Sequence, residues 1–159
     1  LHPRPAGQRM FDLFAYFAGE TSAFGIFEDR FGRERKRFSV AILGRAEGSS
    51  LCLEEDFLFS DGTTSQRIWF LRREADNRFS GTCADVIGEA AGEQSAGCAS
   101  MTYAMKLDIG NRRSLKVTFS DVFYAAGNGT VINRATVTKW GIGIGQALIV
   151  FNKPPVNVS

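Results

Sequence analysis

Four ionisable residues fall on the apolar side of segments in which apolar and polar side chains alternate. They are Glu55, Arg67, Asp121 and Arg134. Asp121, for example, shares its alternation with Phe119 and Phe123, and Arg134 shares its alternation with Ile132, although Thr136 and Thr138 on the same side are polar. Burying a lone charge is costly, so these groups should pair with one another or line a wet cavity. An arginine fork on a carboxylate is the pairing that such a set favours.

The predicted ligand-binding residues combine charge with aromatic surface at one polar end of an otherwise apolar pocket. They are Glu55, Arg67, Trp69, Tyr103, Asp121 and Arg134. In this interpretation the two arginines hold an anionic head group against the two carboxylates, and the rings contact the apolar part of the ligand. No catalytic residue and no metal ligand is predicted.

The same residues also admit other interpretations. An enzyme of isomerase or cyclase type could use Asp121 or Glu55 as an internal proton shuttle and Tyr103 as an acid. The charges could instead form internal salt bridges that fix the strand register, or bulges could turn them outward. A second acidic pair, Asp85 and Glu89, could act as acid and base if their environments differ, but carboxylates in such a segment usually face solvent.

Histidine and cysteine usage excludes several kinds of site. His2 is the only histidine and lies in the predicted N-terminal tail, so zinc hydrolysis and Ser-His catalysis lack their usual group. The cysteines, Cys52, Cys83 and Cys98, show no CxxC spacing and are odd in number, which argues against a zinc site and a disulfide scaffold. One bridge, between Cys83 and Cys98, stays open. No cofactor is expected.

The charge pattern also limits the partners. The net charge is +2, with basic and acidic residues interspersed except for a basic cluster within 33–37. We interpret that cluster as a solvated turn between two strands rather than as a phosphate or lipid site, and no nucleic-acid partner is expected. The alternating glycines of 141–145 are not a dinucleotide fingerprint, because no helix follows them.

Alternation with a period of two recurs through most of the chain and predicts about ten strands. The predicted ranges are 21–30, 35–46, 50–59, 64–73, 78–85, 87–95, 98–108, 113–125, 130–139 and 142–151. Tight-turn signals separate them, most strongly Asp61-Gly62 and Asn128-Gly129. A meander of this length exposes two edges unless it closes. We therefore predict an all-β, up-and-down antiparallel barrel, with an open sandwich as the alternative.

Parity assigns the inner face of each predicted strand. In the seventh predicted strand, the inward set is Met101, Tyr103, Met105 and Leu107. In the last, it is Ile142, Ile144, Leu148 and Val150. A barrel of this size has room for its side chains and one small ligand.

An amphipathic segment precedes the strands and carries apolar residues at helical spacing: Met10, Leu13, Phe14 and Phe17. It predicts one short helix over about 9–18, stopped by Gly19, that plugs one end of the barrel. We expect one barrel domain over 10–152, with tails at 1–9 and 153–159. No apolar run approaches the ~20 residues of a membrane-spanning helix.

Several motifs taken together resemble one protein family. They lie at 17–19, 25–32, 53–57, 61–62, 67–69, 84–92, 133–135 and 139–141. The family consists of small bacterial proteins, chiefly proteobacterial, of unknown function, often described as candidate lipoproteins. The resemblance covers nearly all of 14–152. It implies a lipocalin-like barrel and a periplasmic or envelope-associated location, and it implies no activity.

The chain departs from the family pattern in two places. Ser120-Asp121-Val122 stands where the family commonly has an aspartate pair and a tryptophan. Lipoprotein members carry an acylated cysteine near the mature N-terminus, and residues 1–20 contain no cysteine. A lipid anchor is therefore not expected in the chain as given.

The function expected from these observations is a non-enzymatic barrel that binds a small apolar or amphipathic ligand, such as a fatty acid or lipid fragment. The alternatives are the isomerase or cyclase named above and a structural or assembly module of the cell envelope. A cavity above about 300 Å³ with convergent polar groups would favour the first two functions. A filled interior would favour the third.

Overall fold

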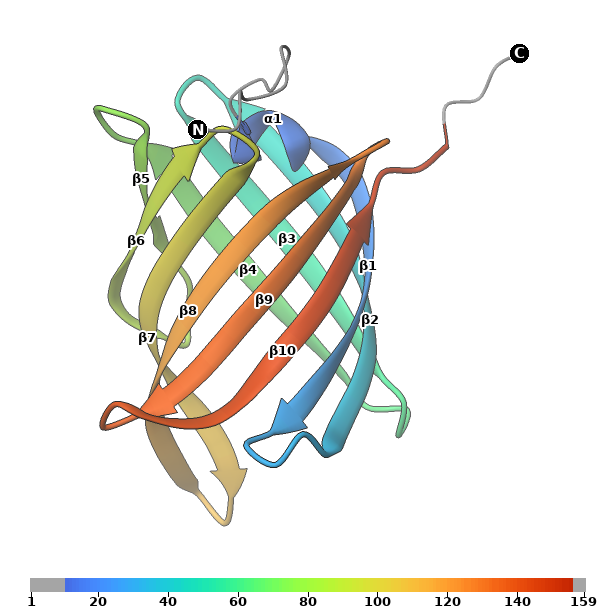
Figure 1. Cartoon of the computed structure of the whole chain (residues 1–159), viewed down its shortest axis with the longest axis vertical. Coiled ribbons are helices and arrows are strands. Elements are labelled where there is room, and N and C mark those ends of the chain that lie inside the picture. The colour runs from blue at the N-terminus through green and yellow to red at the C-terminus, as the bar shows by residue number, and fades with distance from the viewer. Residues whose placement is uncertain (1–10, 156–159) are drawn as a thin grey trace, which may run out of the picture.

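All ten predicted strands are present, and each pairs with its neighbours in the chain. The structure, a computed structural model, describes residues 11–155. Its elements are α1 (Leu13–Tyr16), β1 (Gly19–Asp29), β2 (Glu34–Glu47), β3 (Ser50–Phe59), β4 (Thr64–Arg73), β5 (Arg78–Thr82), β6 (Val86–Ser95), β7 (Cys98–Gly110), β8 (Arg113–Gly127), β9 (Thr130–Lys139) and β10 (Ile142–Asn152). β1 also pairs with β10 in antiparallel fashion, so the sheet closes (Figure 1). The predicted closed meander is confirmed, and the open sandwich is excluded.

The tight turns have the backbone conformations that their sequences predict. Asn128 and Gly129 both have left-handed backbones, with φ of 54° and 77°, as a two-residue hairpin turn between twisted strands requires. In the β3–β4 turn, Gly62 has a φ of 87°. There the Asp61 carboxylate accepts a hydrogen bond from the backbone N–H of Thr63 at 3.0 Å.

The basic cluster of 33–37 lies in an exposed turn and the exposed start of β2, as predicted. Two of its arginines form ion pairs with nearby carboxylates. Arg35 lies 2.7 Å from Asp29, and Arg37 lies 2.7 Å from Glu34. Part of the positive charge is therefore neutralised locally.

The predicted helix is present but is shorter than predicted. α1 spans only Leu13–Tyr16, because Asp12 caps its start and strand β1 begins at Gly19. The Asp12 carboxylate accepts hydrogen bonds from the backbone N–H groups of Phe14 and Ala15 at 3.0 and 3.3 Å. Among the described residues, no helix is long and apolar enough to cross a membrane. Met10 and the tail residues 1–9 and 156–159 lie outside the part of the chain that the structure describes.

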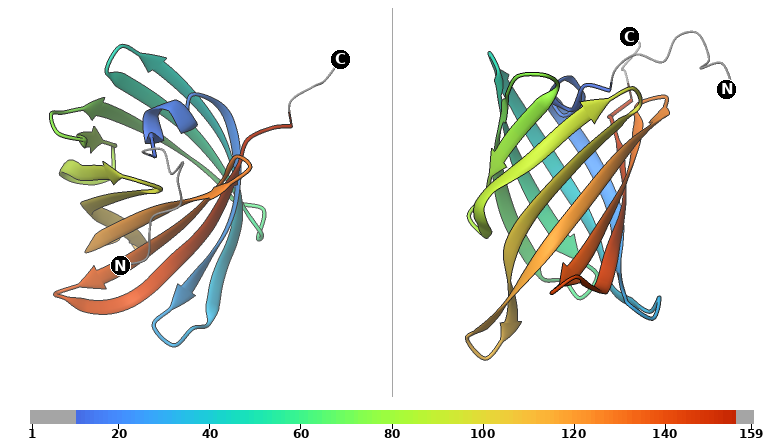
Figure 2. Two further views of the ribbon diagram at one scale, coloured as in Figure 1. Left: turned by 45° about the horizontal axis from the view of Figure 1, so that its top comes forward. Right: turned by 60° about the vertical axis from the view of Figure 1, so that its left-hand side comes forward.

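α1 covers one end of the barrel, as the left view in Figure 2 shows. The side chains of Leu13, Phe14 and Phe17 are buried. The Phe17 ring packs edge-on against Phe151, with 5.2 Å between ring centroids. Gly44 permits this approach, because a Cβ added there would overlap the carbonyl oxygen of Phe17. The plug predicted from the sequence is therefore present.

β9 and β10 turn the opposite face inward from the predicted one. Parity had assigned Ile132, Arg134 and the isoleucine-rich side of β10 to the interior. The buried residues are instead the alternate ones: Val131, Asn133, Ala135, Val137, Gly145, Ala147 and Phe151. The inner positions here are mostly small because neighbouring rings fill the space; a Cβ on Gly145 would lie 2.6 Å from the ring of Phe27. Ile132, Ile142 and Val150 lie exposed on the outer side of these two strands.

The wall between β4 and β5 is short. Only four residue pairs join these strands, between 70–73 of β4 and 79–82 of β5. The half of β4 farther from α1 borders the turn after β5 instead. A surface hollow there is lined by both segments, including Arg67 and Asp85. Arg67 also lines the interior cavity, so its side chain lies between this hollow and the inside of the barrel.

Candidate functional site

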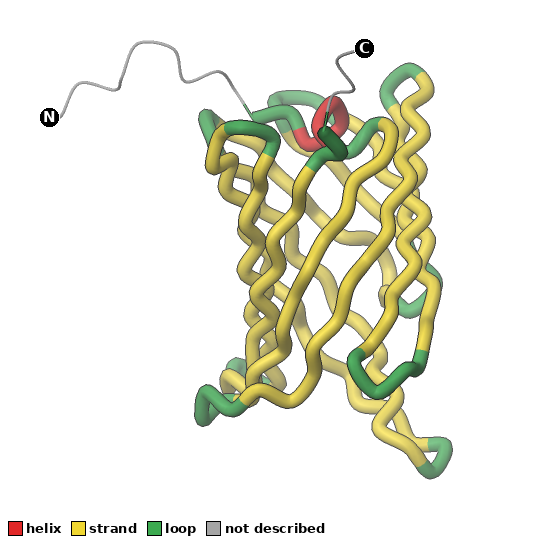
Figure 3. Tube along the Cα trace, turned by 90° about the vertical axis from the view of Figure 1, so that its right-hand side faces the viewer, coloured by secondary structure: helices red, strands yellow, loops and turns green. Residues whose placement is uncertain are grey.

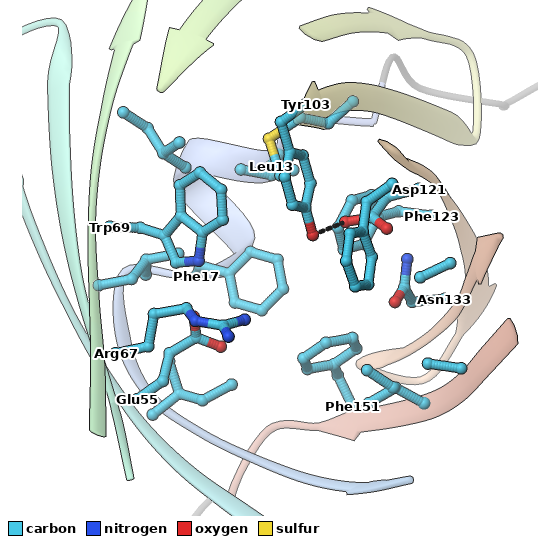
Figure 4. Close-up of a pocket in the computed structure, with 18 of the residues that line it drawn as sticks. Leu13, Phe17, Glu55, Arg67, Trp69, Tyr103, Asp121, Phe123, Asn133 and Phe151 are labelled. Carbon is cyan, nitrogen blue, oxygen red and sulfur yellow. Dashed lines mark hydrogen bonds between the residues drawn. The ribbon is translucent and has the colours of Figure 1, made fainter. Parts of the chain in front are cut away.

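A cavity of about 190 Å³ lies inside the barrel beneath α1 (Figure 4). Its wall is mainly apolar, with aromatic rings and aliphatic side chains from α1, from β2 to β4 and from β7 to β10. Six lining residues carry polar groups: Glu55, Arg67, Trp69, Tyr103, Asp121 and Asn133. The interior is therefore not completely filled. Its volume is nevertheless below the value of about 300 Å³ that drug-sized ligands usually occupy.

The Glu55 carboxylate faces this cavity from β3. It makes no hydrogen bond and no ion pair shorter than 4.0 Å with any residue of 11–155. Burial raises the pKa of Glu55 to about 7, although the positive charge of Arg67 acts in the opposite direction. The carboxyl group therefore exchanges its proton near neutral pH.

Arg67 lies directly opposite Glu55 in the register of β3 and β4. Its guanidinium pairs with the Asp85 carboxylate at 3.5 Å and lies 5.7 Å from the centroid of the Phe57 ring. The Arg67 side chain is 28% exposed and that of Asp85 is 46% exposed. This ion pair thus lies between the cavity and the surface hollow that β4 and the turn after β5 form.

Asp121 and Tyr103 form the second polar group, on the other side of the cavity. Tyr103 donates a hydrogen bond from its hydroxyl to Oδ2 of Asp121 at 3.2 Å, and both residues are buried. Oδ1 of Asp121 is buried without any hydrogen-bond partner. Figure 4 shows Glu55 and Arg67 on one wall and Asp121 and Asn133 on the facing wall.

The two carboxyl groups share an electrostatic environment. Burial raises the pKa of Asp121 to about 7; the hydrogen bond from Tyr103 lowers it, the charge of Glu55 raises it and that of Arg67 lowers it. Burial, followed by the charge of Asp121, raises the pKa of Tyr103 well above its usual value. Tyr103 therefore stays protonated and acts as a donor, while Asp121 and Glu55 can each carry or release a proton near neutral pH.

Aromatic rings hold these groups in place. Tyr103 stacks on Phe119 at a centroid distance of 5.3 Å, and Trp69 lies edge-on to Tyr103 at 5.1 Å. Trp69 and Tyr103, both predicted to be site residues, therefore form one wall of the cavity. Such packing fixes the position of the Tyr103 hydroxyl relative to Asp121.

Arg134 is the one predicted site residue that the structure places elsewhere. It lies exposed on the outer face of β9, where it donates a hydrogen bond to the hydroxyl of Tyr124 at 3.3 Å. Its neighbour Asn133 takes the inner position, is buried, and donates a hydrogen bond to the carbonyl oxygen of Val122 at 3.2 Å. The assignment failed because parity with Ile132 was given more weight than the small inner residues of this strand.

The second acidic pair, for which the sequence favoured a solvent-facing position, does not come together as a site. Asp85 pairs with Arg67, whereas Glu89 is exposed on the outer surface of β6. The three cysteines are free thiols, so the bridge between Cys83 and Cys98 is not formed. Within 11–155, no three His, Cys, Asp or Glu side chains gather in a way that could hold a metal ion.

Comparison with known proteins shows the fold and the family. No curated protein matches the sequence. Among solved structures, an S-type phycobiliprotein lyase from Guillardia theta is similar, with a TM-score of 0.66 and 8% sequence identity, over 91% of this chain and 92% of that one. At that identity the likeness shows the fold alone, and it agrees with the lipocalin-like barrel that the family resemblance implied. A family model described as a protein of unknown function, DUF3833, matches residues 4–153. The chain therefore belongs to the DUF3833 family.

Proposed function

We propose that this barrel binds a small amphipathic ligand of the fatty-acid type. The apolar part of the ligand occupies the cavity, and its acidic head group lies between Arg67 and Glu55 on one wall and Asp121 on the other. The similar structure of the lyase from Guillardia theta shows a shared fold and gives no information about which ligand this barrel binds.

The observation that carries this proposal is the presence of unpartnered polar groups in an apolar cavity. Oδ1 of Asp121 is buried without a hydrogen-bond partner, and the half-buried Glu55 carboxylate makes no hydrogen bond with any residue of 11–155. Buried polar groups are nearly always satisfied, and leaving one unsatisfied costs about 1–3 kcal/mol. A set that served only to fix the strand register would be expected to satisfy its members internally, whereas a binding site keeps them for the ligand.

The charges around the cavity favour a head group that both donates and accepts hydrogen bonds. Arg67 supplies N–H donors, and Glu55 and Asp121 change from acceptor to donor when they bind a proton. A carboxylic acid meets both requirements, because its oxygens accept from the guanidinium and its own proton can be shared with a carboxylate. An alkane or an ester would leave part of the set unsatisfied.

The volume of the cavity limits the length of the ligand. An engineered cavity of about 150 Å³ holds one benzene ring, so about 190 Å³ fits a short or medium acyl chain or a single ring system. A long chain would have to continue through the hollow beside Arg67 and Asp85. Lipid-derived acids of this kind would be at hand in the cell envelope, the location that the family resemblance implies.

The proposal can be tested with protein purified without detergent. Native mass spectrometry would detect a co-purified acid, and calorimetry with saturated fatty acids of increasing chain length would measure affinity. We expect affinity to rise with chain length and to level off once the cavity is full, and the methyl ester of the best acid to bind less tightly. The absence of both a co-purified ligand and measurable binding across the series would contradict the proposal.

A second candidate function is proton transfer at a carbon atom of the bound molecule. The pKa values of about 7 for Glu55 and Asp121 favour it, because a general base works best when its pKa lies near the working pH. Proton NMR in D₂O distinguishes it from binding alone. An enzyme of this kind would exchange carbon-bound protons of the ligand, and Glu55→Gln would abolish the exchange while retaining binding; a pure binding protein would give no exchange.

A further inference from the structure

The hairpin turns at the end of the barrel opposite α1 combine exposed apolar residues with positive charge. Three of them, counted with their flanking strand residues at 29–34, 109–113 and 139–142, contain five basic residues and two acidic residues. Their large apolar side chains are strongly exposed: Phe31 at 69%, Ile109 at 57%, Trp140 at 87% and Ile142 at 60%. These three turns, at the end of the barrel opposite α1, are called the basic-aromatic end below. Figure 3 shows the loops at both ends of the barrel.

The turns at the α1 end have a different composition. They span 47–50, 73–78, 95–98 and 127–130, and they contain no aromatic residue and no Ile, Leu, Val or Met. Their charged residues are three acidic and two basic ones. Turns in general tolerate polar residues well, so large exposed apolar side chains that occur in the turns at one end and not in those at the other call for a specific explanation.

Trp140 is the most informative of these residues. Its backbone is left-handed, with a φ of 51°, a conformation that strongly disfavours bulky side chains and suits glycine or asparagine. The ring is almost fully exposed, and its nearest charged partner is the ammonium of Lys139, 4.5 Å from the ring centroid. Tryptophan therefore costs stability at this turn and gains little packing within the barrel, which indicates a role outside the fold.

Phe31 repeats the combination of an exposed ring with cations. The guanidinium groups of Arg30 and Arg33 lie 4.8 and 5.9 Å from the centroid of its ring. An aromatic ring beside basic side chains is the composition found where proteins meet the headgroup level of a membrane. Arginine and lysine there also bind anionic phosphates.

We propose that the basic-aromatic end docks on an anionic lipid bilayer, with Phe31, Ile109, Trp140 and Ile142 inserted at headgroup level and the adjacent basic side chains against lipid phosphates. A fluid surface suits apolar residues on separate hairpin tips, since each tip inserts on its own. A protein partner would favour a continuous apolar core with a polar rim. The proposal is independent of the ligand proposed above, and docking could succeed or fail whether or not the cavity binds an acid.

Vesicle binding of the full chain tests this proposal. The protein would be sedimented with vesicles of phosphatidylcholine alone and of phosphatidylcholine mixed with phosphatidylglycerol. The test variant carries Phe31→Ser and Trp140→Asn, the second of which suits the left-handed turn and should not destabilise the fold; thermal unfolding verifies this. The matched control is Phe70→Ser, which removes a ring that is 59% exposed on the side wall of the barrel.

We expect binding to the anionic vesicles that falls with rising salt. The double variant should bind at least about tenfold more weakly, because two apolar anchors are lost. Phe70→Ser should bind like the unchanged protein. Trp69 is buried, so a blue shift of tryptophan emission on vesicle addition would report Trp140. No binding to anionic vesicles, equal binding by the double variant, or emission that stays unchanged on binding would each overturn the proposal, and the first result would leave a protein partner as the occupant of this end.

Discussion

Glu55 and Arg67 lie directly opposite each other on β3 and β4, yet Arg67 makes its ion pair with Asp85, 3.5 Å away. A cross-strand pair of opposite charges usually joins within the sheet. Here the arginine reaches toward the turn after the short strand β5, and the Glu55 carboxylate is left facing the cavity. The competition between two carboxylates for one guanidinium thus helps to keep a proton acceptor free inside the barrel.

Asp85→Asn should lower the pKa of Glu55 from about 7. Removal of the Asp85 charge leaves the guanidinium of Arg67 without its present partner, and a less neutralised cation stabilises the Glu55 carboxylate more strongly. Titration of the glutamate side-chain carbons by NMR measures the change. Glu89→Gln, which alters an exposed carboxylate nearby in sequence, is the control and should leave Glu55 unaffected. An unchanged Glu55 pKa in Asp85→Asn would show that Asp85 does not govern this charge.

Asp121→Asn should change how stability depends on pH. The pKa of Asp121 is about 7 in the folded chain, raised from the ordinary value of 3.8, so between those pH values the folded state binds more protons than the unfolded state. The free energy of unfolding must therefore fall as the pH rises from about 4 to 7, and stay reduced above pH 7. The variant lacks this loss, on the order of a few kcal/mol, while its side-chain oxygen still accepts the hydrogen bond from Tyr103.

Urea unfolding at pH 4 and pH 8 would measure this difference, since about 4 and about 7 bound the titration. We expect the variant to be more stable than the unchanged protein at the higher pH and to lose the advantage at the lower pH. Asp56→Asn, on the exposed outer face of β3, is the control and should not flatten the profile. If Asp121→Asn left the pH dependence unchanged, the claim that Asp121 holds a proton in the folded state up to about pH 7 would be contradicted.

Gly44→Ala should destabilise the barrel by displacing α1. A Cβ at this position would overlap the carbonyl oxygen of Phe17, which belongs to the backbone and cannot turn away. We expect a loss of about 1–3 kcal/mol in the free energy of unfolding, together with greater access of solvent to the cavity. Gly143→Ala is the matched control, because a Cβ there meets nothing within 4 Å. Equal stability of the two variants would mean that α1 does not depend on this close approach.

The strand boundaries could be predicted from the sequence because alternation and turn chemistry are local. β3, β4 and β9 begin and end at the predicted residues, and Asn128-Gly129 forms the predicted turn. The inner faces were predicted correctly where large apolar residues mark them, as in the Met101 and Tyr103 side of β7. They were wrong in β9 and β10, where several inner positions are small residues such as Ala135 and Ala147, which do not stand out in the sequence as an apolar face.

The site was predicted only in part for the same reason. Glu55, Arg67 and Asp121 were found because their charge contrasts with large apolar neighbours on the same face. Asn133 was missed, although parity with Val131 and Val137 would have placed it inside. The pairing of Arg67 with Asp85 depends on the shortness of β5 and on how the following turn lies beside β4, and nothing local in the sequence determines that geometry.

The two arginines of the predicted site give the most direct test of ligand binding. Arg67 lines the cavity, while Arg134 lies outside on β9, so Arg67→Gln and Arg134→Gln make the same chemical change on opposite sides of the wall. Both would be made in a Trp140→Asn background. Trp69, which lines the cavity, then remains as the only tryptophan and reports occupancy by its fluorescence.

The decisive measurement is the titration of Trp69 fluorescence with the medium-chain fatty acid that binds best. The account predicts saturable quenching in the background protein. Arg67→Gln should lower the affinity by at least about tenfold, as loss of a charge-assisted hydrogen bond implies, and Arg134→Gln should leave the affinity unchanged. Quenching that is absent, or that responds equally to both substitutions, would contradict the claim that the interior of this barrel binds an acidic ligand.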